Sequence, residues 1–306
     1  MEKPTVRMVA AVPVATVWTT PASPREMDRP AIENPADLTG WLQAMGYEDR
    51  LQLCEANLVQ TQVLYGSLVE AIEEEAGWLK VVIPSQPSKK DGRGYPGWMP
   101  KCQLLEASGF AANPDQPTAV VTSSAARLYN KEGEPGITLS FLTRLPVISQ
   151  SDEWIEVATP TGPQLLKQSD AAVYLTERDI PIGTGKQIVE AGKRFLGLPY
   201  LWGGMSSFGY DCSGFAYNMH LANGMVIPRD ASDQAKQGKA VERQELQPGD
   251  LLFFAYEEGK GAVHHVGIYA GDDMMLHSPK TGKTIELLRL SGSAYEVELC
   301  AARRYW

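Results

Sequence analysis

Short apolar runs, separated by turn residues, dominate the first two thirds of the chain. Apolar and β-branched residues alternate there with polar ones, and Gly, Pro, Asn and Asp stand between the runs, which predicts short strands. A single helix is expected to interrupt them, because residues 34–38 carry helix-start residues and Trp41, Leu42 and Met45 follow at helical spacing. The expected strands are residues 61–66, 67–72, 77–83, 97–100, 119–122, 126–129, 137–141, 145–148 and 153–157.

A weak internal repeat runs through this β-rich region. Residues 77–81 (GWLKV) resemble residues 153–157 (EWIEV), and each segment follows an acidic stretch that we expect to be a solvated turn, Glu73–Glu75 in the first case. The repeat indicates two copies of one small all-β barrel. We place the first copy, with its helical insertion, at residues 1–107 and the second at residues 108–178.

The pattern changes near residue 179 to helices followed by strands. Residues 185–195 form an amphipathic helical pattern, and a second helix is expected to begin at Cys212, with Asp211 as its N-cap and Asn223–Gly224 as its stop. Helices first and a sheet after predict an α+β unit at residues 179–306. The expected strands of this unit are residues 250–254, 265–270, 274–277, 284–288 and 297–303.

Composition excludes several classes of protein. The chain has 306 residues, enough for two or three domains, and its net charge of −9 argues against a nucleic-acid partner. No apolar run is long enough to span a bilayer, and no signal peptide is evident, so a cytoplasmic protein is expected unless a secretion signal has been removed. The four cysteines form no CxxC pair and no zinc-ligand spacing, so no metal or cofactor is expected.

Cys212 is the best candidate nucleophile. Backbone N–H groups and the helix dipole favour a thiolate at a helix start, and such a thiol needs a histidine base with an orienting partner. His265 opens an expected strand and His277 ends the next, so adjacent antiparallel strands could bring them together as base and orienting residue. His264 is the alternative base, since neighbouring strand residues face opposite ways. His220 is expected to be a surface or packing residue.

The remaining cysteines are expected to be structural. Free cysteine is among the most buried residue types, and the neighbours of Cys54, Cys102 and Cys300 have the character of a strand or helix core. Trp202 is likewise expected to be a core aromatic.

Six motifs in order resemble the NlpC/P60 family of cell-wall peptidases. That resemblance implies a papain-like fold with a Cys212–His265–His277 triad, and it implies that Tyr200 helps the Cys212 backbone N–H to bind the oxyanion. The motifs are residues 199–204 (PYLWGG), 211–215 (DCSGF), 228–234 (PRDASDQ), 247–254 (QPGDLLFF), 265–269 (HVGIY) and 276–278 (LHS).

The whole chain resembles YkfC-type γ-D-glutamyl-L-diamino acid endopeptidases, in which two bacterial SH3 (SH3b) domains precede the NlpC/P60 domain. Residues 17–24, 61–66 and 94–100 resemble the first SH3b domain of that subfamily. The resemblance implies cleavage after γ-linked D-Glu in murein tripeptides or tetrapeptides with a free N-terminal L-Ala. It also implies that the first SH3b domain walls off the cleft at that amine. We expect a monomeric enzyme of cell-wall peptide recycling.

The resemblance also implies a set of substrate-binding residues. Asp211 and Tyr95 are expected at the L-Ala ammonium, which needs an anion and hydrogen-bond acceptors. A glutamate of the subfamily aligns nearest to Gln60, with Glu55 and Glu70 nearby. A neutral amide at that position would weaken recognition of the amine and a strict requirement for L-Ala. Ser213 and Ser232 are expected to hydrogen-bond the D-Glu carboxylate or the substrate main chain.

Two other functions stay open at this point. One is a secreted hydrolase that cuts intact peptidoglycan and uses its SH3b domains as wall anchors. The other is a catalytically inactive module that binds wall fragments, which the complete Cys/His/His set disfavours. The choice between meso-diaminopimelate and L-lysine as the diamino acid is not determined by the sequence.

Overall fold

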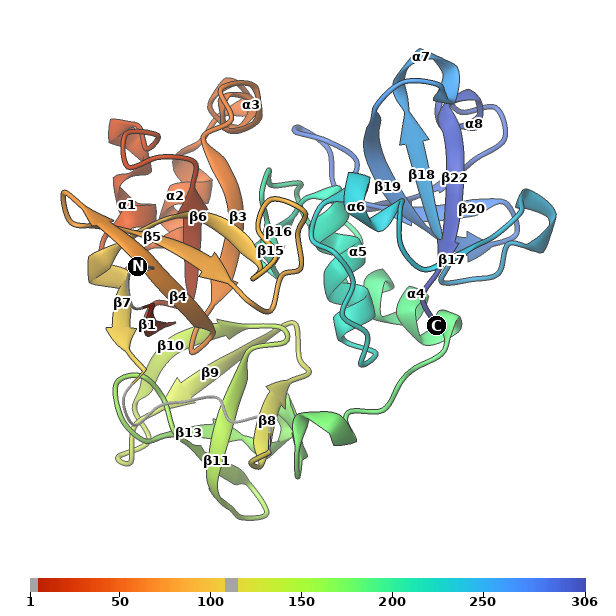
Figure 1. Cartoon of the computed structure of the whole chain (residues 1–306). Helices are drawn as coiled ribbons and strands as arrows, with labels where there is room; N and C mark the ends of the chain where they lie inside the picture. Colours follow the sequence, from red (N-terminus) through yellow and green to blue (C-terminus); the bar gives the residue numbers. More distant parts are fainter. Residues whose placement is uncertain (1–4, 108–114) are drawn as a thin grey trace. The chain divides into compact units, whose positions relative to one another are not determined.

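The computed structural model describes residues 5–107 and 115–306 (Figure 1). The chain divides into two compact units. The first unit comprises Met1–Ser85, Arg93–Ile180 and Ser206–Phe208. The second comprises Gln86–Gly92, Pro181–Met205 and Gly209–Trp306. Among the described residues, no helix is both long and apolar enough to cross a bilayer.

The first unit contains two seven-stranded antiparallel sheets. The strand order of the first sheet is β3-β2-β6-β5-β4-β1-β7, and its inward-facing side chains, among them Val17, Val81 and Met99, form one hydrophobic cluster. Its strands are β1 (Val6–Ala10), β2 (Val14–Trp18), β3 (Val59–Leu64), β4 (Leu68–Glu75), β5 (Trp78–Ile83), β6 (Tyr95–Pro100) and β7 (Leu104–Glu106).

The second sheet repeats the connectivity of the first. Its order is β10-β9-β13-β12-β11-β8-β14, which is the same order when strands are counted from the start of each sheet. The two segments of the sequence repeat, β5 and β12, therefore occupy the same place in their sheets. The strands are β8 (Thr118–Val121), β9 (Ala125–Tyr129), β10 (Pro135–Ser140), β11 (Arg144–Gln150), β12 (Trp154–Val157), β13 (Gln164–Lys167) and β14 (Ala171–Tyr174).

The acidic triplet Glu73–Glu75 is not a turn, contrary to the prediction. These exposed residues end β4, and the chain reverses at Ala76 and Gly77, whose φ angles are 48° and 83°. Pairing with β5, in which Glu73 faces Lys80 and Glu75 faces Trp78, holds the triplet extended. Cross-strand partners thus decide the conformation of residues that have little strand propensity of their own.

Along the chain, helices are inserted between β2 and β3 of the first sheet (Figure 1, red and orange). The predicted helix is α2 (Leu38–Ala44), and the Asp37 side chain caps it by accepting from the Gly40 N–H at 2.8 Å. Sequence reasoning missed α3, in which Leu53 alone is buried, because so little apolar periodicity gives no helical signal. The other short elements of this unit are η1 (Glu26–Asp28), α1 (Arg29–Ile32), α3 (Tyr47–Glu55), η2 (Lys101–Gln103), η3 (Gln168–Asp170) and η4 (Glu177–Asp179).

The second unit packs two main helices against an antiparallel sheet in the order β17-β22-β18-β19-β20-β21. Gly192 on α4 permits close packing, because a Cβ there would lie 2.7 Å from the Leu276 side chain and 2.9 Å from that of Phe215. The main elements are α4 (Gly185–Lys193), α5 (Cys212–Leu221), β17 (Lys239–Ala240), β18 (Leu251–Ala255), β19 (Val263–Gly271), β20 (Met274–His277), β21 (Glu286–Arg289) and β22 (Leu299–Arg304).

Shorter elements complete the chain. The predicted last strand begins later than expected, at Leu299, because the preceding four residues form α8. The shorter elements are β15 (Met205–Ser206), β16 (Gly209–Tyr210), α6 (Ala231–Gln234), η5 (Arg243–Glu245), α7 (Tyr256–Gly259) and α8 (Tyr295–Glu298).

Two adjacent leucines of β13 test the assigned faces of the second sheet. Leu166 is fully buried in its core, whereas Leu165 is partly exposed. Leu166→Ala should lower the free energy of unfolding of the first unit by about 2–5 kcal/mol, because it leaves a cavity. Leu165→Ala should cost less than about 1 kcal/mol. Urea unfolding followed by tryptophan fluorescence measures both, and equal effects would contradict the assigned register.

Candidate active site

Cys212 is the first residue of α5, as predicted. The Asp211 side chain caps the helix by accepting from the Gly214 N–H at 2.6 Å. The helix start lies tightly against the preceding loop, because a Cβ on Gly214 would stand 2.2 Å from the Gly204 carbonyl oxygen. Glycine at 214 is therefore needed for this approach, and the half-buried thiol is held at the positive end of the helix.

Two buried imidazoles face each other across neighbouring strands. His265 on β19 is 2% exposed and His277 on β20 is fully buried, and the His265 Nε2 lies 2.8 Å from the His277 Nδ1. Gly267 makes room for this pair, because a Cβ there would lie 3.2 Å from the His277 Cβ and 2.2 Å from the Met275 sulfur. The two histidines that the sequence proposed as base and orienting residue are thus brought together.

His264 and His220 lie elsewhere. The ring of His264 stacks on that of Tyr256 with centroids 4.1 Å apart, and its Nε2 is 3.3 Å from the Glu298 carboxylate. His220 is buried, and its Nδ1 is 2.8 Å from the Ala216 carbonyl oxygen, as expected for a packing residue. Neither ring hydrogen-bonds to the His265–His277 pair.

Burial disfavours the charged forms of the Cys212 thiol and of both imidazoles. Burial raises the pKa of Cys212 to about 12, and the Asp211 charge adds to this rise. Hydrogen bonds from the Val266 and Ser213 backbone oppose it. Burial lowers the pKa of His277 to about 4, and burial with the neighbouring imidazoles lowers that of His265 well below 6.5. Thiolate and imidazolium are therefore expected to form together, when a proton moves from the sulfur to an imidazole.

Tyr295 is a site residue that the sequence analysis missed. Its ring stacks on His265 with centroids 5.0 Å apart and meets His277 edge-on at 5.2 Å. Burial, with the nearby charges of Cys212, Glu298 and Glu286, raises its pKa to about 12, so the hydroxyl keeps its proton. It lies on α8, a short helix without a capping or periodic signal, so nothing local in the sequence marks it.

Arg229 forms the centre of a buried polar cluster next to Cys212 in sequence, around Asp211 and Ser213. It is 1% exposed, and its two terminal nitrogens lie 3.1 and 2.6 Å from the two Asp211 carboxylate oxygens. It also donates to the Ser213 hydroxyl at 2.8 Å, and that hydroxyl donates to Asp211. The sequence pattern predicts roles for Asp211 and Ser213 but none for the arginine that holds them both.

Ser232 lies on α6, where a basic loop approaches. Lys89 Nζ is 3.1 Å from the Ser232 hydroxyl and 3.3 Å from an Asp233 carboxylate oxygen. The Lys89 N–H also donates to Asp233, and the Arg229 N–H donates to the Pro87 carbonyl. Because of these contacts, residues 86–92 belong to the second unit, although they follow β5 in sequence.

Tyr200 is buried, and backbone contacts hold it against the segment before Cys212. Its N–H donates to the Lys283 carbonyl at 3.0 Å, and it forms a bridge with Tyr210. The next residue, Leu201, donates to the Tyr210 carbonyl at 3.1 Å. The backbone of Tyr200, which is predicted to bind the oxyanion, is therefore held by hydrogen bonds beside the segment that leads into Cys212.

Two predicted substrate-binding residues belong to the first unit. Tyr95 is 2% exposed and contributes to the hydrophobic cluster of the first sheet. Gln60 donates from its amide to the Thr19 hydroxyl at 2.7 Å and to the Asn57 side chain at 3.0 Å. A role toward substrate stays a prediction for both.

The expectation that the other cysteines are core residues is wrong for two of them. Cys102 and Cys300 are exposed, and each thiol approaches a backbone carbonyl oxygen, at 3.4 and 3.3 Å. Cys102 lies in η2, just before β7, and Cys300 lies in β22, so apolar neighbours in the sequence made both resemble core positions.

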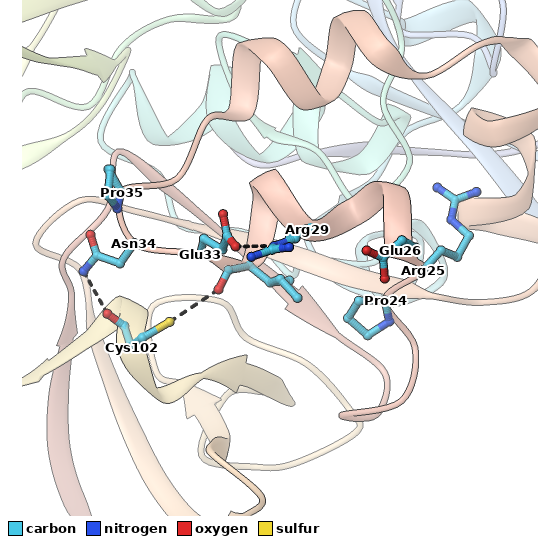
Figure 2. Close-up of a pocket in the computed structure, with 9 residues that line it drawn as sticks. Pro24, Arg25, Glu26, Arg29, Glu33, Asn34, Pro35 and Cys102 are labelled. Atoms are coloured by element: carbon cyan, nitrogen blue, oxygen red, sulfur yellow. Dashed lines mark hydrogen bonds and ion pairs between the residues drawn. The ribbon is translucent and has the colours of Figure 1, made fainter.

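An open hollow of about 840 Å³ in the first unit holds none of the predicted site residues (Figure 2). It lies beside α1, and Arg29 and Glu33 form an ion pair at its wall. In the described part of the chain, no group of three or more His, Cys, Asp or Glu residues is placed to hold a metal ion.

Comparison with known proteins matches both kinds of domain. Residues 197–304 match the model of the NlpC/P60 family, and residues 121–174 match that of the YKFC SH3b2 domain. A gamma-D-glutamyl-L-lysine dipeptidyl-peptidase of Bacillus subtilis strain 168 is 50% identical over 95% of this chain and 96% of its own length. A Bacillus cereus protein of the same name is 40% identical over 99% of this chain and 92% of its own.

A solved structure agrees with these matches. The crystal structure of an NlpC/P60 family protein from Bacillus cereus ATCC 10987 superposes with a TM-score of 0.94 at 39% sequence identity. The match covers 98% of this chain and 99% of the other.

The Arg229 cluster gives a stability prediction. Arg229→Leu should lower the free energy of unfolding by about 3–5 kcal/mol, because it leaves the buried Asp211 carboxylate without its partner. The double variant Arg229→Leu with Asp211→Asn should recover much of that loss, since no unpaired charge remains. Urea unfolding of the three proteins measures both values, and a cost below about 1 kcal/mol for Arg229→Leu would contradict a buried ion pair.

The buried histidines predict a stability loss in acid. His220 and His277 have folded-state pKa values of about 4, below the ordinary 6.5. The unfolded chain therefore binds more protons between these values, and the free energy of unfolding falls by about 3 kcal/mol per histidine as pH drops from 6.5 to 4. In urea unfolding across this range, His220→Asn should show a smaller fall than the wild type; an unchanged fall would refute the assignment.

The comparisons and the geometry lead to one identification. The matched NlpC/P60 segment contains the helix-start cysteine and the buried histidine pair. Relatives that share more than nine tenths of their length with this chain carry peptidase names. The chain therefore belongs to the NlpC/P60 family and is a cysteine peptidase with an SH3b domain.

Proposed function

We propose that the enzyme cleaves the bond between γ-D-Glu and the diamino acid of murein tripeptides or tetrapeptides that begin with a free L-Ala. The observation that carries the proposal is the identity of 50%, along nearly the whole chain, to a protein named for γ-D-glutamyl-L-lysine peptides. The Cys212 thiol and the paired imidazoles of His265 and His277 supply groups for such a hydrolysis.

In the proposed reaction, His265 takes the proton of Cys212, and the thiolate attacks the γ-carbonyl carbon of D-Glu. The Cys212 N–H and the Tyr200 hydroxyl stabilise the oxyanion. As the C–N bond breaks, His265 gives its proton to the departing amine of the diamino acid, which leaves a thioester on Cys212. His265 then takes a proton from water, the resulting hydroxide attacks the thioester, and L-Ala-D-Glu is released as the thiol is restored.

Substrate recognition is proposed to use Asp211, Tyr95 and Gln60 at the L-Ala amine, and Ser213 and Ser232 at D-Glu. The Oδ1 of Asp211 accepts three hydrogen bonds, whereas its Oδ2 accepts one, from Arg229. An ionised carboxylate has about four acceptor sites, so Oδ2 retains room for an ammonium donor. Because Arg229 balances the Asp211 charge, this contact acts as a directed hydrogen bond more than as a full charge pair.

The proposal includes the architecture around this site. We take both seven-stranded sheets as SH3b barrels, at residues 1–107 and 108–178, because their strand orders are the same. The peptidase domain, residues 179–306, is proposed to be papain-like, since a helix that starts with the nucleophile packs on the strand that carries the base. A monomer that acts in the cytoplasm, in peptide recycling, is the proposed context.

Incubation with L-Ala-γ-D-Glu-L-Lys tests the activity. Mass spectrometry should detect free lysine and L-Ala-D-Glu, and Cys212→Ala should reduce the rate by at least about 1,000-fold, because the nucleophile is lost. Cys102→Ala is the matched control and should retain the wild-type rate. Running the meso-diaminopimelate peptide in parallel identifies the preferred diamino acid.

Two further substrates decide the specificity. N-acetylation of L-Ala should abolish cleavage if a free amine is required, and purified sacculi should be digested far more slowly than free peptides. Cleavage between L-Ala and D-Glu, or full activity of Cys212→Ala, would refute the proposal. Digestion of sacculi at the rate of free peptides would instead favour a hydrolase of intact wall.

A further inference from the structure

One nitrogen of the histidine pair has no hydrogen-bond partner. The Nε2 of His277 is buried, and no donor or acceptor of the described residues lies within hydrogen-bond range of it. A buried polar atom without a partner costs free energy, so an unpaired nitrogen at an active site calls for a functional explanation.

A carboxylate lies just beyond that range. The Oε1 of Glu286 is 3.6 Å from the His277 Nε2, and the Glu286 side chain is 45% exposed. The two residues are directly opposed in the antiparallel pair of β20 and β21. A small rotation of this half-exposed side chain brings the oxygen into hydrogen-bond distance, and such bonds are often long before substrate binds.

The contact at the other ring nitrogen of His277, Nδ1, determines which nitrogen of this ring carries the proton. The His265 Nε2 faces the His277 Nδ1, so the other ring nitrogen of His265, Nδ1, is the one left for the thiol. When His265 takes the thiol proton, its Nε2–H must donate to a lone pair on the His277 Nδ1. His277 then has to carry its own proton on Nε2, the nitrogen next to Glu286.

We propose that Glu286 is a positioning residue that accepts a hydrogen bond from the His277 Nε2–H and so holds His277 in the tautomer that His265 requires. Glu286 acts through His277 and does not touch the substrate. Tyr295 completes the arrangement, because its ring packs against both imidazoles and restricts their rotation.

The groups around the pair set the direction of the electrostatic effect. His265 meets His277 at its Nδ1, and the ring of His264 stacks near that of His265 with centroids 6.4 Å apart. The neutral Tyr295 packs on the rings of the pair, and the Glu286 carboxylate lies 3.6 Å from the His277 Nε2. A carboxylate there favours positive charge on the imidazole pair once His265 is protonated. Removal of that charge should lower the basicity of His265 and reduce the population of the thiolate–imidazolium pair.

Three variants separate positioning from structure. Glu286→Gln removes the charge, Glu286→Asp keeps a carboxylate, and Glu190→Gln is a surface control, since Glu190 pairs with Lys193 on α4 in the same unit. With L-Ala-γ-D-Glu-L-Lys, Glu286→Gln should lower kcat by about 10- to 100-fold with little change in KM, by analogy with carboxylates that orient metal-ligating histidines. The alkaline limb of its pH profile should move to lower pH, and Glu286→Asp should restore part of kcat.

A second readout does not depend on the peptide. Iodoacetamide alkylation of Cys212, followed by mass spectrometry of the Cys212 peptide, should be slower in Glu286→Gln than in the wild type near neutral pH. The difference should shrink as pH rises and the free thiolate forms. If the peptide were not a substrate, the alkylation profile would still report on the Cys212–His265 pair, which separates this inference from the proposed specificity.

Two outcomes would overturn the role of Glu286. One is a wild-type kcat and an unshifted pH profile in Glu286→Gln. The other is a loss of activity that follows a lower melting temperature, with both pH profiles unshifted, since that would indicate a structural role. Glu190→Gln should match the wild type in every measurement.

Discussion

The hydrogen bond between His265 and His277 is the interaction on which the active site depends. Both imidazoles are buried, which disfavours their charged forms, and their contact gives one nitrogen of each ring a partner within the protein. The 2.8 Å contact leaves the other nitrogen of His265 for the thiol. It requires β19 and β20 to lie in one register, which Gly267 permits by leaving space beside His277. In the proposed reaction, the geometry of these two strands sets the direction of proton transfer.

The residues around Cys212 balance a second buried charge, that of Asp211. Asp211 caps the helix but would raise the cost of a thiolate beside it, and Arg229 offsets that effect by pairing with the carboxylate. The same guanidinium holds Ser213, and its backbone N–H is bound by Pro87 of the basic loop. Helix capping, charge balance and the positions of two predicted substrate contacts thus depend on one buried side chain.

Prediction from the sequence succeeded where the signal was local and failed where partners lay far away. The helix start at Cys212 and the strands that carry His265 and His277 follow from capping and alternation. The acidic composition of Glu73–Glu75 predicted a turn. The prediction failed because pairing with β5, which composition does not reveal, keeps the triplet extended. Tyr295 and Arg229 were missed as site residues, since their roles come from contacts with residues 16 or more positions away.

The sequence by itself determined the chemistry of this protein: a cysteine at a capped helix start, two histidines on successive strands, and motifs in the order of a known peptidase family. These features are encoded by short-range propensities and residue identity. The tertiary structure alone decided which histidine faces inward, which arginine neutralises Asp211, and that Glu286 lies beside His277. Those relations depend on strand register and on packing between distant segments, which no local pattern records.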